Sequence, residues 1–451
     1  MMREGWINIE LGKLCSFSQG IQVPIKNQFK EPHENRVRFL RIIDFTQGNE
    51  RPRYIEKSNG HHLVKKHDIS MVRYGTVGFV CTGKEGAIAN NLFRIIPDVE
   101  IENRYLVEFF KSSFFRQHLD PKGATMQALS FGLIKPIMIP LPPLPEQRAI
   151  VAKIEQLFSE LDNGIANLKA AKAKLAIYRQ AVLKKAFEGE LTKEWWGKNQ
   201  SAPWKKLRIS EIGEIVTGNT PSKKNASYYS SNEYPFYKPT DLEAGSNVKY
   251  SIDGLSKEGF ETGRMAAESS ILVTCIGATI GKTGLIKRKG CFNQQINAII
   301  PDERMDSKYI YYQAISVDFQ NQIKTNASAT TLPILNKGKF SILEMAICPL
   351  KEQKQIVQEI ETRLSVCDNI LRNIEEGLEK AEALRQSILK KAFEGKLLNE
   401  IELAACRQQP DWEPAEKLLA RIRRDAMHRV STTKRAPTHE WQPRKQNKNQ
   451  I

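Results

Sequence analysis

The segment that comes nearest to a cofactor-binding motif is GATIGKT, which begins at Gly277. It combines two glycines with a Lys-Thr pair, the residue types with which phosphate-binding loops hold nucleotides. Only three residues separate Gly277 from Gly281, whereas that loop requires four, because the spacing decides whether successive backbone N–H groups can surround a phosphate. The related segment RYGTVGF, from Arg73, lacks the Lys-Thr pair. We therefore expect a strand, a turn with Gly277 and Gly281, and a second strand.

Other catalytic patterns are also missing from the sequence. It contains no glycine-rich dinucleotide loop, no HExxH motif, no GxSxG elbow and no Asn/Asp-Pro-Pro-aromatic segment of the kind that an adenine methyltransferase needs. His61, His62 and His67 lie close together without cysteines or paired carboxylates at ligand spacing, so exposed loop histidines are a better interpretation than a metal site. We expect a non-catalytic binding protein with no cofactor and no metal of its own.

A basic cluster in the first third of the chain indicates a polyanionic partner. Between residues 36 and 66 eight lysines and arginines stand against three acids, and the whole chain carries a net charge of +17. Nucleic acid supplies the phosphates that such a surface neutralises. A solvated basic face that only keeps the protein soluble is the alternative. The residues expected to contact double-stranded DNA here are Arg36, Arg38, Arg41, Arg51, Arg53 and Arg73.

A second candidate surface, in the middle of the chain, mixes cations with aromatic rings, as a base-contacting surface does. Half-buried strand residues would give the same pattern, so both interpretations stay open. The expected DNA contacts in this region are Lys223, Lys224, Tyr237 and Lys238.

Length and composition limit the class of protein. The 451 residues, 41% of them hydrophobic, allow two or three domains with cores of their own. The longest apolar runs fall far short of the roughly 20 residues that a membrane-spanning helix needs, and no signal peptide is recognisable. The seven cysteines are scattered, odd in number and without a CxxC pair, which favours a reduced, cytoplasmic location.

The elements that must position these residues are revealed by an internal repeat. The 47 residues from Leu144 recur without a gap from Leu350, at a constant offset of 206 residues and with 21 identities. The identities include the LKKAFEG runs that begin at Leu183 and Leu389. Two copies at so long a period exclude a solenoid and indicate a large unit duplicated within one polypeptide. We expect internal pseudo-twofold symmetry.

Each copy of the repeat has the pattern of a long helix. Apolar residues recur at alternating spacings of three and four, from Val151 to Val182 and from Val357 to Ile388, with interruptions at Lys172, Arg179 and Arg385. A 3.5-residue repeat held over about five heptads predicts a coiled coil.

The ends and the pairing of these helices follow from their flanks. Both are expected to start after a proline-rich lead and to stop at a glycine, Gly189 or Gly395. We favour antiparallel pairing of the two helices, which would hold the preceding domains at opposite ends of a rod. Two independent core helices are the alternative.

The segments that precede the helices are also related, though weakly. Trp6 aligns with Trp204, and FLRIIDF from Phe39 aligns with FYKPTDL from Phe236, so that Arg41 matches Lys238. The offset drifts from 197 to 206, which indicates loops inserted and deleted on a shared scaffold. Arg41 and Lys238 are the strongest paired candidates for base contacts, although phosphate contacts or plain surface charges would explain them equally well.

The predicted fold class is α+β: two mixed α/β domains joined by two long helices that form an antiparallel coiled coil. The predicted domains are residues 1–142, a helical spacer at 143–199, a second α/β domain at 200–348, a second spacer at 349–400, and a basic, partly disordered tail at 401–451.

This layout resembles the specificity subunit of type I restriction-modification systems. The second helix lead departs from the first, because Cys348, Pro349, Leu350 and Lys351 replace its Pro-Leu-Pro run. The motifs that carry the resemblance are Gly218 with Thr220, Pro221 and Ser222; Gly277 to Gly281; LPPLPEQR from Leu141; Glu352 with Gln353; and the two LKKAFEG endings.

The resemblance implies that each α/β domain recognises one half of a split, asymmetric DNA site and that the paired helices fix the gap. It implies docking of two adenine-N6 methyltransferase subunits and two ATP-dependent restriction-translocase subunits. S-adenosylmethionine, ATP and Mg²⁺ would then be bound by these partners. The residues assigned to partner docking are Glu146, Gln147, Phe187, Gly189, Glu352, Gln353, Phe393 and Gly395.

A different class of protein stays open on the sequence alone. A basic coiled-coil scaffold would bind nucleic acid without recognising a sequence. Its affinity would fall uniformly with salt, and it would show no preferred site.

Overall fold

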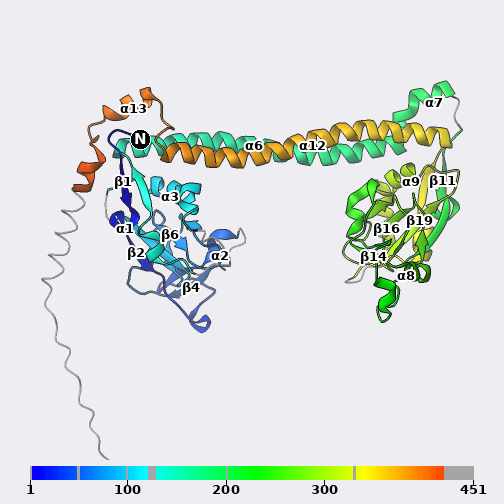
Figure 1. The fold of residues 1–451 in the computed structure, drawn as a ribbon, viewed down its shortest axis with the longest axis horizontal. Helices are drawn as coiled ribbons and strands as arrows, with labels where there is room; N and C mark the ends of the chain where they lie inside the picture. Colours follow the sequence, from blue (N-terminus) through cyan, green and yellow to red (C-terminus); the bar gives the residue numbers. More distant parts are fainter. Residues whose placement is uncertain are drawn as a thin grey trace, which may run out of the picture. The chain divides into compact units, whose positions relative to one another are not determined.

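The computed structural model describes residues 3–47, 51–97, 100–119, 128–199, 202–328 and 332–420. The chain divides into two compact units, each with an α/β domain and parts of both long helices (Figure 1). The first unit consists of Met1–Ala166 and Leu378–Ile451, and the second of Asn167–Gly377. These units cross the boundaries expected from sequence, because each long helix begins in one unit and ends in the other.

The α/β domain of the first unit contains three small sheets. β1 (Ile7–Glu10) pairs with β10 (Met138–Leu141). The second sheet has the order β2 (Cys15–Gln19), β9 (Leu92–Pro97), β6 (Ile69–Val72) and β7 (Val80–Cys81). The third has the order β4 (Arg53–Glu56), β3 (Arg36–Leu40), β8 (Gly86–Ile88) and β5 (Leu63–Val64). The helices are α1 (Leu11–Leu14), α2 (Ile42–Thr46), α3 (Asn103–Lys111), α4 (Ser113–Arg116) and α5 (Phe131–Ile134), with a 3₁₀ turn, η1, at Ile25–Asn27.

The second unit repeats this topology strand for strand. β11 (Lys205–Arg208) pairs with β20 (Glu344–Ile347). The four-stranded sheets have the orders β12 (Gly213–Thr217), β19 (Ile296–Pro301), β16 (Ile271–Thr274), β17 (Thr283–Leu285), and β14 (Asp253–Leu255), β13 (Tyr234–Tyr237), β18 (Gly290–Phe292), β15 (Met265–Ala266). The helices are α7 (Lys193–Asn199), α8 (Lys257–Thr262), α9 (Ser307–Ala314), α10 (Val317–Asn326) and α11 (Lys337–Ser341), and the 3₁₀ segments are η2 (Glu190–Thr192), η3 (Ile209–Glu211), η4 (Ala226–Tyr229) and η5 (Asp241–Asn247).

The strand register confirms that FLRIIDF and FYKPTDL are equivalent segments. β3 runs parallel to β8 with Phe39 opposite Ala87, and β13 runs parallel to β18 with Phe236 opposite Cys291. Arg41 and Lys238 each follow directly after the strand, at the same point of the fold.

The cores are built from apolar strands and from the ends of the long helices. All four residues of β6 and all four of β16 are buried, as expected for short strands covered on both faces. The C-terminal end of α12 (Leu350–Phe393) adds Ile388, Leu389, Ala392 and Phe393 to the core of the first unit. The C-terminal end of α6 (Leu144–Phe187) adds Leu183 and Ala186 to the core of the second. Each repeat ending therefore packs on the domain that precedes the other helix.

The antiparallel pairing of α6 with α12 is confirmed by ion pairs. In the second unit Lys172 pairs with Glu375 at 2.9 Å and Arg179 with Asp368, so the partner number falls as the residue number rises. In the first unit Arg385 pairs with Asp162. The three cations that interrupt the apolar pattern thus each bind an acid of the facing helix. The seam residues Ile154, Ile360, Cys367 and Ile374 are buried, as the heptad pattern predicted.

The helices end where the sequence indicated. α6 ends at Phe187 and α12 at Phe393, and Gly189 and Gly395 follow with φ of +79° and +71°. This left-handed conformation is the one in which glycine commonly terminates a helix. A further helix, α13 (Glu400–Arg407), follows α12, and residues 421–451, most of the expected basic tail, lie outside the described residues.

The GATIGKT segment forms the expected strand, turn and strand. It connects β16 to β17, and Gly277 and Gly281 adopt φ of +102° and +87°. The Nζ of Lys282 donates a hydrogen bond to Glu243 at 2.7 Å. Of the three clustered histidines, His62 is buried beside Ser58 and His67 lies 3.8 Å from Asp68. Within the described ranges, no group of three or more His, Cys, Asp or Glu side chains is placed to hold a metal, and no helix combines the length and apolar character of a membrane span.

Candidate nucleic-acid interface

The basic cluster of the first unit is organised around one buried carboxylate, that of Asp44. Arg41 caps α2 and donates its backbone N–H to Asp44 Oδ2 at 2.8 Å and its Nε at 3.0 Å. Arg38 Nη2 lies 3.8 Å from Asp44 Oδ1. The Asp44 side chain is fully buried, whereas those of Arg38 and Arg41 are 28% and 21% exposed. One carboxylate therefore holds two guanidinium groups at the surface.

Further cations crowd this cluster. Burial lowers the pKa of Lys84, the charge of Arg38 lowers it further, and Asp44 opposes both effects. The Lys84 Nζ lies 5.7 Å from the centre of the Phe45 ring. Lys84 therefore lies near Arg38 and Asp44, and a group of cations that share one carboxylate is suited to bind an anion such as a DNA phosphate.

The remaining predicted contacts of the first unit lie at different depths. The Arg36 guanidinium stacks on the Phe29 ring, with its Cζ 3.6 Å from the ring centre. Arg51 is exposed, and its carbonyl oxygen accepts a hydrogen bond from Arg41. Arg53 is the first residue of β4 and is half-exposed. Arg73 donates its Nε to the Leu129 carbonyl at 3.1 Å, so it is partly committed to holding the fold.

The equivalent region of the second unit is less basic. The Lys238 backbone N–H donates to Asp241 Oδ2 at 2.7 Å, as Arg41 does to Asp44, but the Lys238 ammonium pairs with a second acid, Asp253. Lys223 and Lys224 are exposed in the loop before η4.

Tyr237 was expected to contact DNA, but it does not lie at the surface of the second unit. Its side chain is completely buried, and its hydroxyl donates to the Arg288 carbonyl at 2.9 Å. Burial raises its pKa to about 12. It packs in a core cluster with Leu242, Val248 and Phe292, so the alternative interpretation as a strand residue is the right one.

Two surface features were not found from the sequence. In the second unit Tyr250 and Ile252 are 74% and 79% exposed in the loop that leads into β14. The segment KYSID gives no signal for this, because its alternation of apolar and polar residues is also typical of a half-buried strand.

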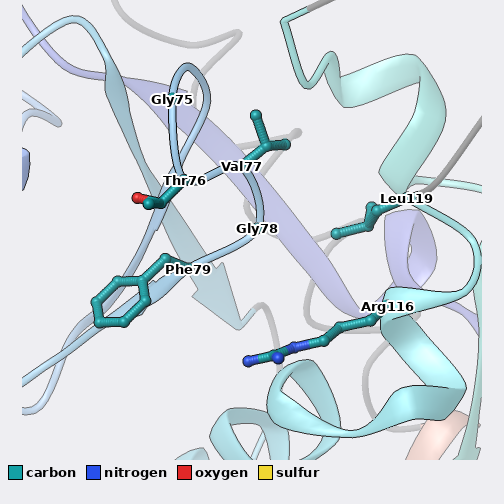
Figure 2. A pocket seen from close by; sticks show the side chains of 7 residues that line it. All are labelled: Gly75, Thr76, Val77, Gly78, Phe79, Arg116 and Leu119. Atoms are coloured by element: carbon teal, nitrogen blue, oxygen red, sulfur yellow. The ribbon is translucent and has the colours of Figure 1, made fainter. Parts of the chain in front are cut away.

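The other feature is a cavity of about 450 Å³ in the first unit, beneath the loop that begins at Gly75 (Figure 2). Phe79, Arg116 and Leu119 line it, and the picture shows Arg116 and Leu119 entering from the helical side. In the second unit Gln320 occupies the position of Arg116, four residues after the N-cap serine, and its Nε2 donates to the Gly281 carbonyl at 2.9 Å. The loop is thus bound to its helix in one unit and stands over a cavity in the other.

The residues assigned to partner docking lie at the junctions between the long helices and the α/β domains, and their part in docking stays a prediction. Trp6 Nε1 donates to Glu146 at 2.7 Å, and Trp204 Nε1 donates to Glu352 at 3.1 Å. Both glutamates are almost fully buried, with 2% and 1% exposure. Their acidic side chains are needed to accept the indole N–H groups, since a buried polar group without a partner is costly.

The other members of these junctions also contact the domains. Gln147 accepts from the Glu102 backbone N–H at 3.0 Å, and Gln353 accepts from that of Asp306 at 2.8 Å. The Phe393 ring meets Tyr105 at 5.2 Å, and the Phe187 ring meets Tyr309 at 5.4 Å. Gly189 and Gly395 lie against Trp204 and Trp6, whose rings would be at an ordinary contact distance of 3.7 and 3.6 Å from an added Cβ, so the positive φ of these positions is what favours glycine. The shared motif residues therefore position the helices on the domains.

Comparison with known proteins agrees with this architecture. The model of the type I restriction modification DNA specificity domain matches residues 3–170 and 202–380. The chain is 28% identical over 320 residues to the EcoKI specificity subunit of Escherichia coli strain K12, covering 67% of each chain. It is 23% identical over 418 residues to the EcoBI specificity subunit of Escherichia coli, covering 88% of this chain and 87% of the relative.

Two solved structures share the fold. One is a chain from a study of complex assembly and conformational transition of the type I R-M system, with a TM-score of 0.69, 19% identity, and coverage of 88% of this chain and 100% of that one. The other is the HsdS subunit from Thermoanaerobacter tengcongensis, with a TM-score of 0.53, 20% identity, and coverage of 88% and 98%.

Two repeated α/β domains joined by a paired-helix spacer define a DNA specificity subunit. Because the family model covers well over half of its length, the chain belongs to the type I restriction-modification specificity family. It is a non-catalytic subunit that supplies DNA recognition to such a system, and this favours sequence recognition over the scaffold alternative.

Proposed function

We propose that each α/β domain recognises one half-site, meaning one of the two separated parts of an asymmetric DNA target. The observation that carries this proposal is the combination of one topology, repeated strand for strand, with different charged residues at the equivalent exposed positions. A shared scaffold brings each domain to DNA in the same way, and different side chains select different bases. The paired helices α6 and α12 connect the two domains and would fix the spacing between the half-sites.

Arg36, Arg38, Arg41, Arg51 and Arg53 are proposed to contact the first half-site, and Lys223, Lys224 and Lys238 the second, with Arg73 supporting the first from its loop. The cluster around Asp44 suits a phosphate, since several cations share one acid. Phosphate contacts fix the orientation of a protein on DNA, and base contacts select the sequence.

We propose that two methyltransferase subunits and two restriction-translocase subunits assemble with this chain. S-adenosylmethionine, ATP and Mg²⁺ would be bound by those subunits and not here. The buried junctions leave the outer faces of the paired helices for docking. In the second unit Ile177, Tyr178, Val366 and Ile370 are 43% to 70% exposed on these helices and are candidates for such contacts. All seven cysteines are buried and unbridged, which is consistent with action in the cytoplasm.

Exchange of the first domain tests the proposal. Residues 1–142 would be replaced by the first domain of another family member, and the hybrid expressed with the methyltransferase subunit of its own system. Methylated sites would then be mapped by single-molecule sequencing. We expect one half-site to change and the other to stay. A change in both half-sites, or in neither, would contradict recognition by two independent domains.

A further inference from the structure

The register of the sheets identifies a second pair of equivalent positions beside Arg41 and Lys238. Phe39 lies opposite Arg53, the first residue of β4, and Phe236 lies opposite Asp253, the first residue of β14. The two domains therefore carry Arg41 with Arg53 at one place and Lys238 with Asp253 at the other. A cation in the first unit is replaced by an acid in the second.

The Lys238–Asp253 ion pair is held in place from both sides. Asp241 accepts hydrogen bonds from the backbone N–H of Lys238 at 2.7 Å and of Ile252 at 3.0 Å. Ser251 Oγ donates to the Asp253 carbonyl at 2.6 Å and accepts from the Phe236 N–H at 3.1 Å. The segments that carry the two charges are thus joined, which fixes the donor and the acceptor next to each other.

The pair lies at an edge with the composition of a contact surface. The side chains of Lys238 and Asp253 are 37% and 44% exposed. Beside them Tyr250 and Ile252 are 74% and 79% exposed, and Lys249 is exposed as well. Cations next to exposed apolar groups suit the DNA major groove, where phosphates and thymine methyl groups are both within reach.

An exposed carboxylate on such a surface limits which groups of DNA can bind there. It is repelled by phosphates, so it weakens non-specific binding to the backbone. It accepts hydrogen bonds from an amino group on a base edge, and cytosine N4 is the group that Asp and Glu accept from. Guanine O6 and N7, on the same base pair, accept from a lysine ammonium. An adjacent ammonium and carboxylate therefore match the major-groove edge of one G·C pair.

We propose that Lys238 and Asp253 together recognise one G·C base pair in the second half-site, and that the β4/β14 starting position is specificity-determining in both domains. Arg53 at this position gives the first domain two donors and no acceptor, which suits a guanine edge or a phosphate. The inference rests on half-site recognition by each domain. An exposed ion pair contributes little to stability, so its two groups can turn to DNA at little cost.

The test is Asp253→Ala in the full chain, expressed with the methyltransferase subunit of its own system, with methylated sites mapped against the wild type. We expect one position of the second half-site, G·C in the wild type, to accept other base pairs, with their methylation raised roughly 10- to 100-fold. The first half-site should stay unchanged. Asp253→Asn, of equal size and without charge, should also relax that position, and Lys238→Ala should relax the same one. Asp302→Ala, which removes the acid of another exposed ion pair of this unit, should leave the target unchanged.

Different failures have different meanings. An unchanged target with both Asp253 variants, or relaxation spread over several positions, overturns the role of the pair. If the wild-type target lacks a G·C pair in its second half-site, the base assignment is wrong. A wild-type chain that yields no split target, with a methyltransferase active on another specificity chain, overturns half-site recognition itself.

Discussion

The two buried glutamates, Glu146 and Glu352, each accept a hydrogen bond from a tryptophan, but their other neighbours differ. Glu146 accepts from Trp6 and, at 3.3 Å, from Trp412, which comes from the segment after α13. Glu352 accepts from Trp204 and, at 3.2 Å, from Thr192. In the second unit a cavity of about 450 Å³, lined in part by Trp196, lies beside the junction. The junction itself is retained in both units, and what surrounds it differs.

The same division holds across both domains. Buried positions repeat: Tyr105 and Tyr309 each donate to a carbonyl of the last strand, at Pro140 and Ala346, both at 2.7 Å. Exposed positions diverge, as Arg53 and Asp253 show. A duplicated scaffold can therefore acquire two DNA targets without changing its core, because packing constrains the interior and not the surface.

The largest expected effect is on the stability of the junctions. Trp6→Ala removes a side chain that is 6% exposed and leaves Glu146 with one donor fewer, so we expect a loss of about 3–5 kcal/mol in the first unit. Trp204 is half-buried, so Trp204→Ala should cost less in the second unit. Native-state hydrogen exchange with mass spectrometry reports each unit separately. Trp196→Ala, at a side chain 47% exposed, is the control. Equal losses of stability for Trp6→Ala and Trp204→Ala would show that the burial of the tryptophan does not determine the size of the loss.

A smaller effect is expected from the second donor at each glutamate. Trp412→Phe keeps a ring and removes the N–H, and Thr192→Val keeps the volume and removes the hydroxyl. Each should lower the stability of its own unit by about 1 kcal/mol, since a net hydrogen bond is worth roughly that much. Urea unfolding followed by the same exchange measurement checks both variants. A loss in the unit that was not altered would contradict independent junctions.

The smallest effect is expected along the paired helices. The Arg385 side chain is 26% exposed, pairs with Asp162 and lies 4.5 Å from the Phe158 ring. The Lys172 side chain is 49% exposed and pairs with Glu375. Arg385→Ala should therefore destabilise its helix segment more than Lys172→Ala, with both losses near or below 1 kcal/mol. Hydrogen-exchange protection of peptides within α6 and α12 gives the order of the two losses. A larger loss of protection for Lys172→Ala than for Arg385→Ala would contradict the prediction.

The repeat and the heptads made the helices, their pairing and their glycine ends predictable. These features depend on local spacing, which a sequence displays directly. The matched positions of Arg41 and Lys238 were predictable for the same reason, because the segments FLRIIDF and FYKPTDL align without a gap.

Burial could not be predicted, because spacing does not display it. Glu146, Gln147, Glu352 and Gln353 accept hydrogen bonds from N–H groups of residues far away in the sequence, and nothing in the local pattern indicates these partners. Tyr237 lies in the aromatic strand Tyr234–Tyr237, whose burial depends on the strands that pair with it, β14 and β18. The Lys238–Asp253 pair joins residues whose adjacency follows only from sheet register.

The most direct test of recognition by two domains is a map of methylated bases in cells that express this chain with the methyltransferase subunit of its own system. We predict a split, asymmetric target with N6-methyladenine in both halves. A single continuous target, or no target when the methyltransferase is active with another specificity chain, would contradict it.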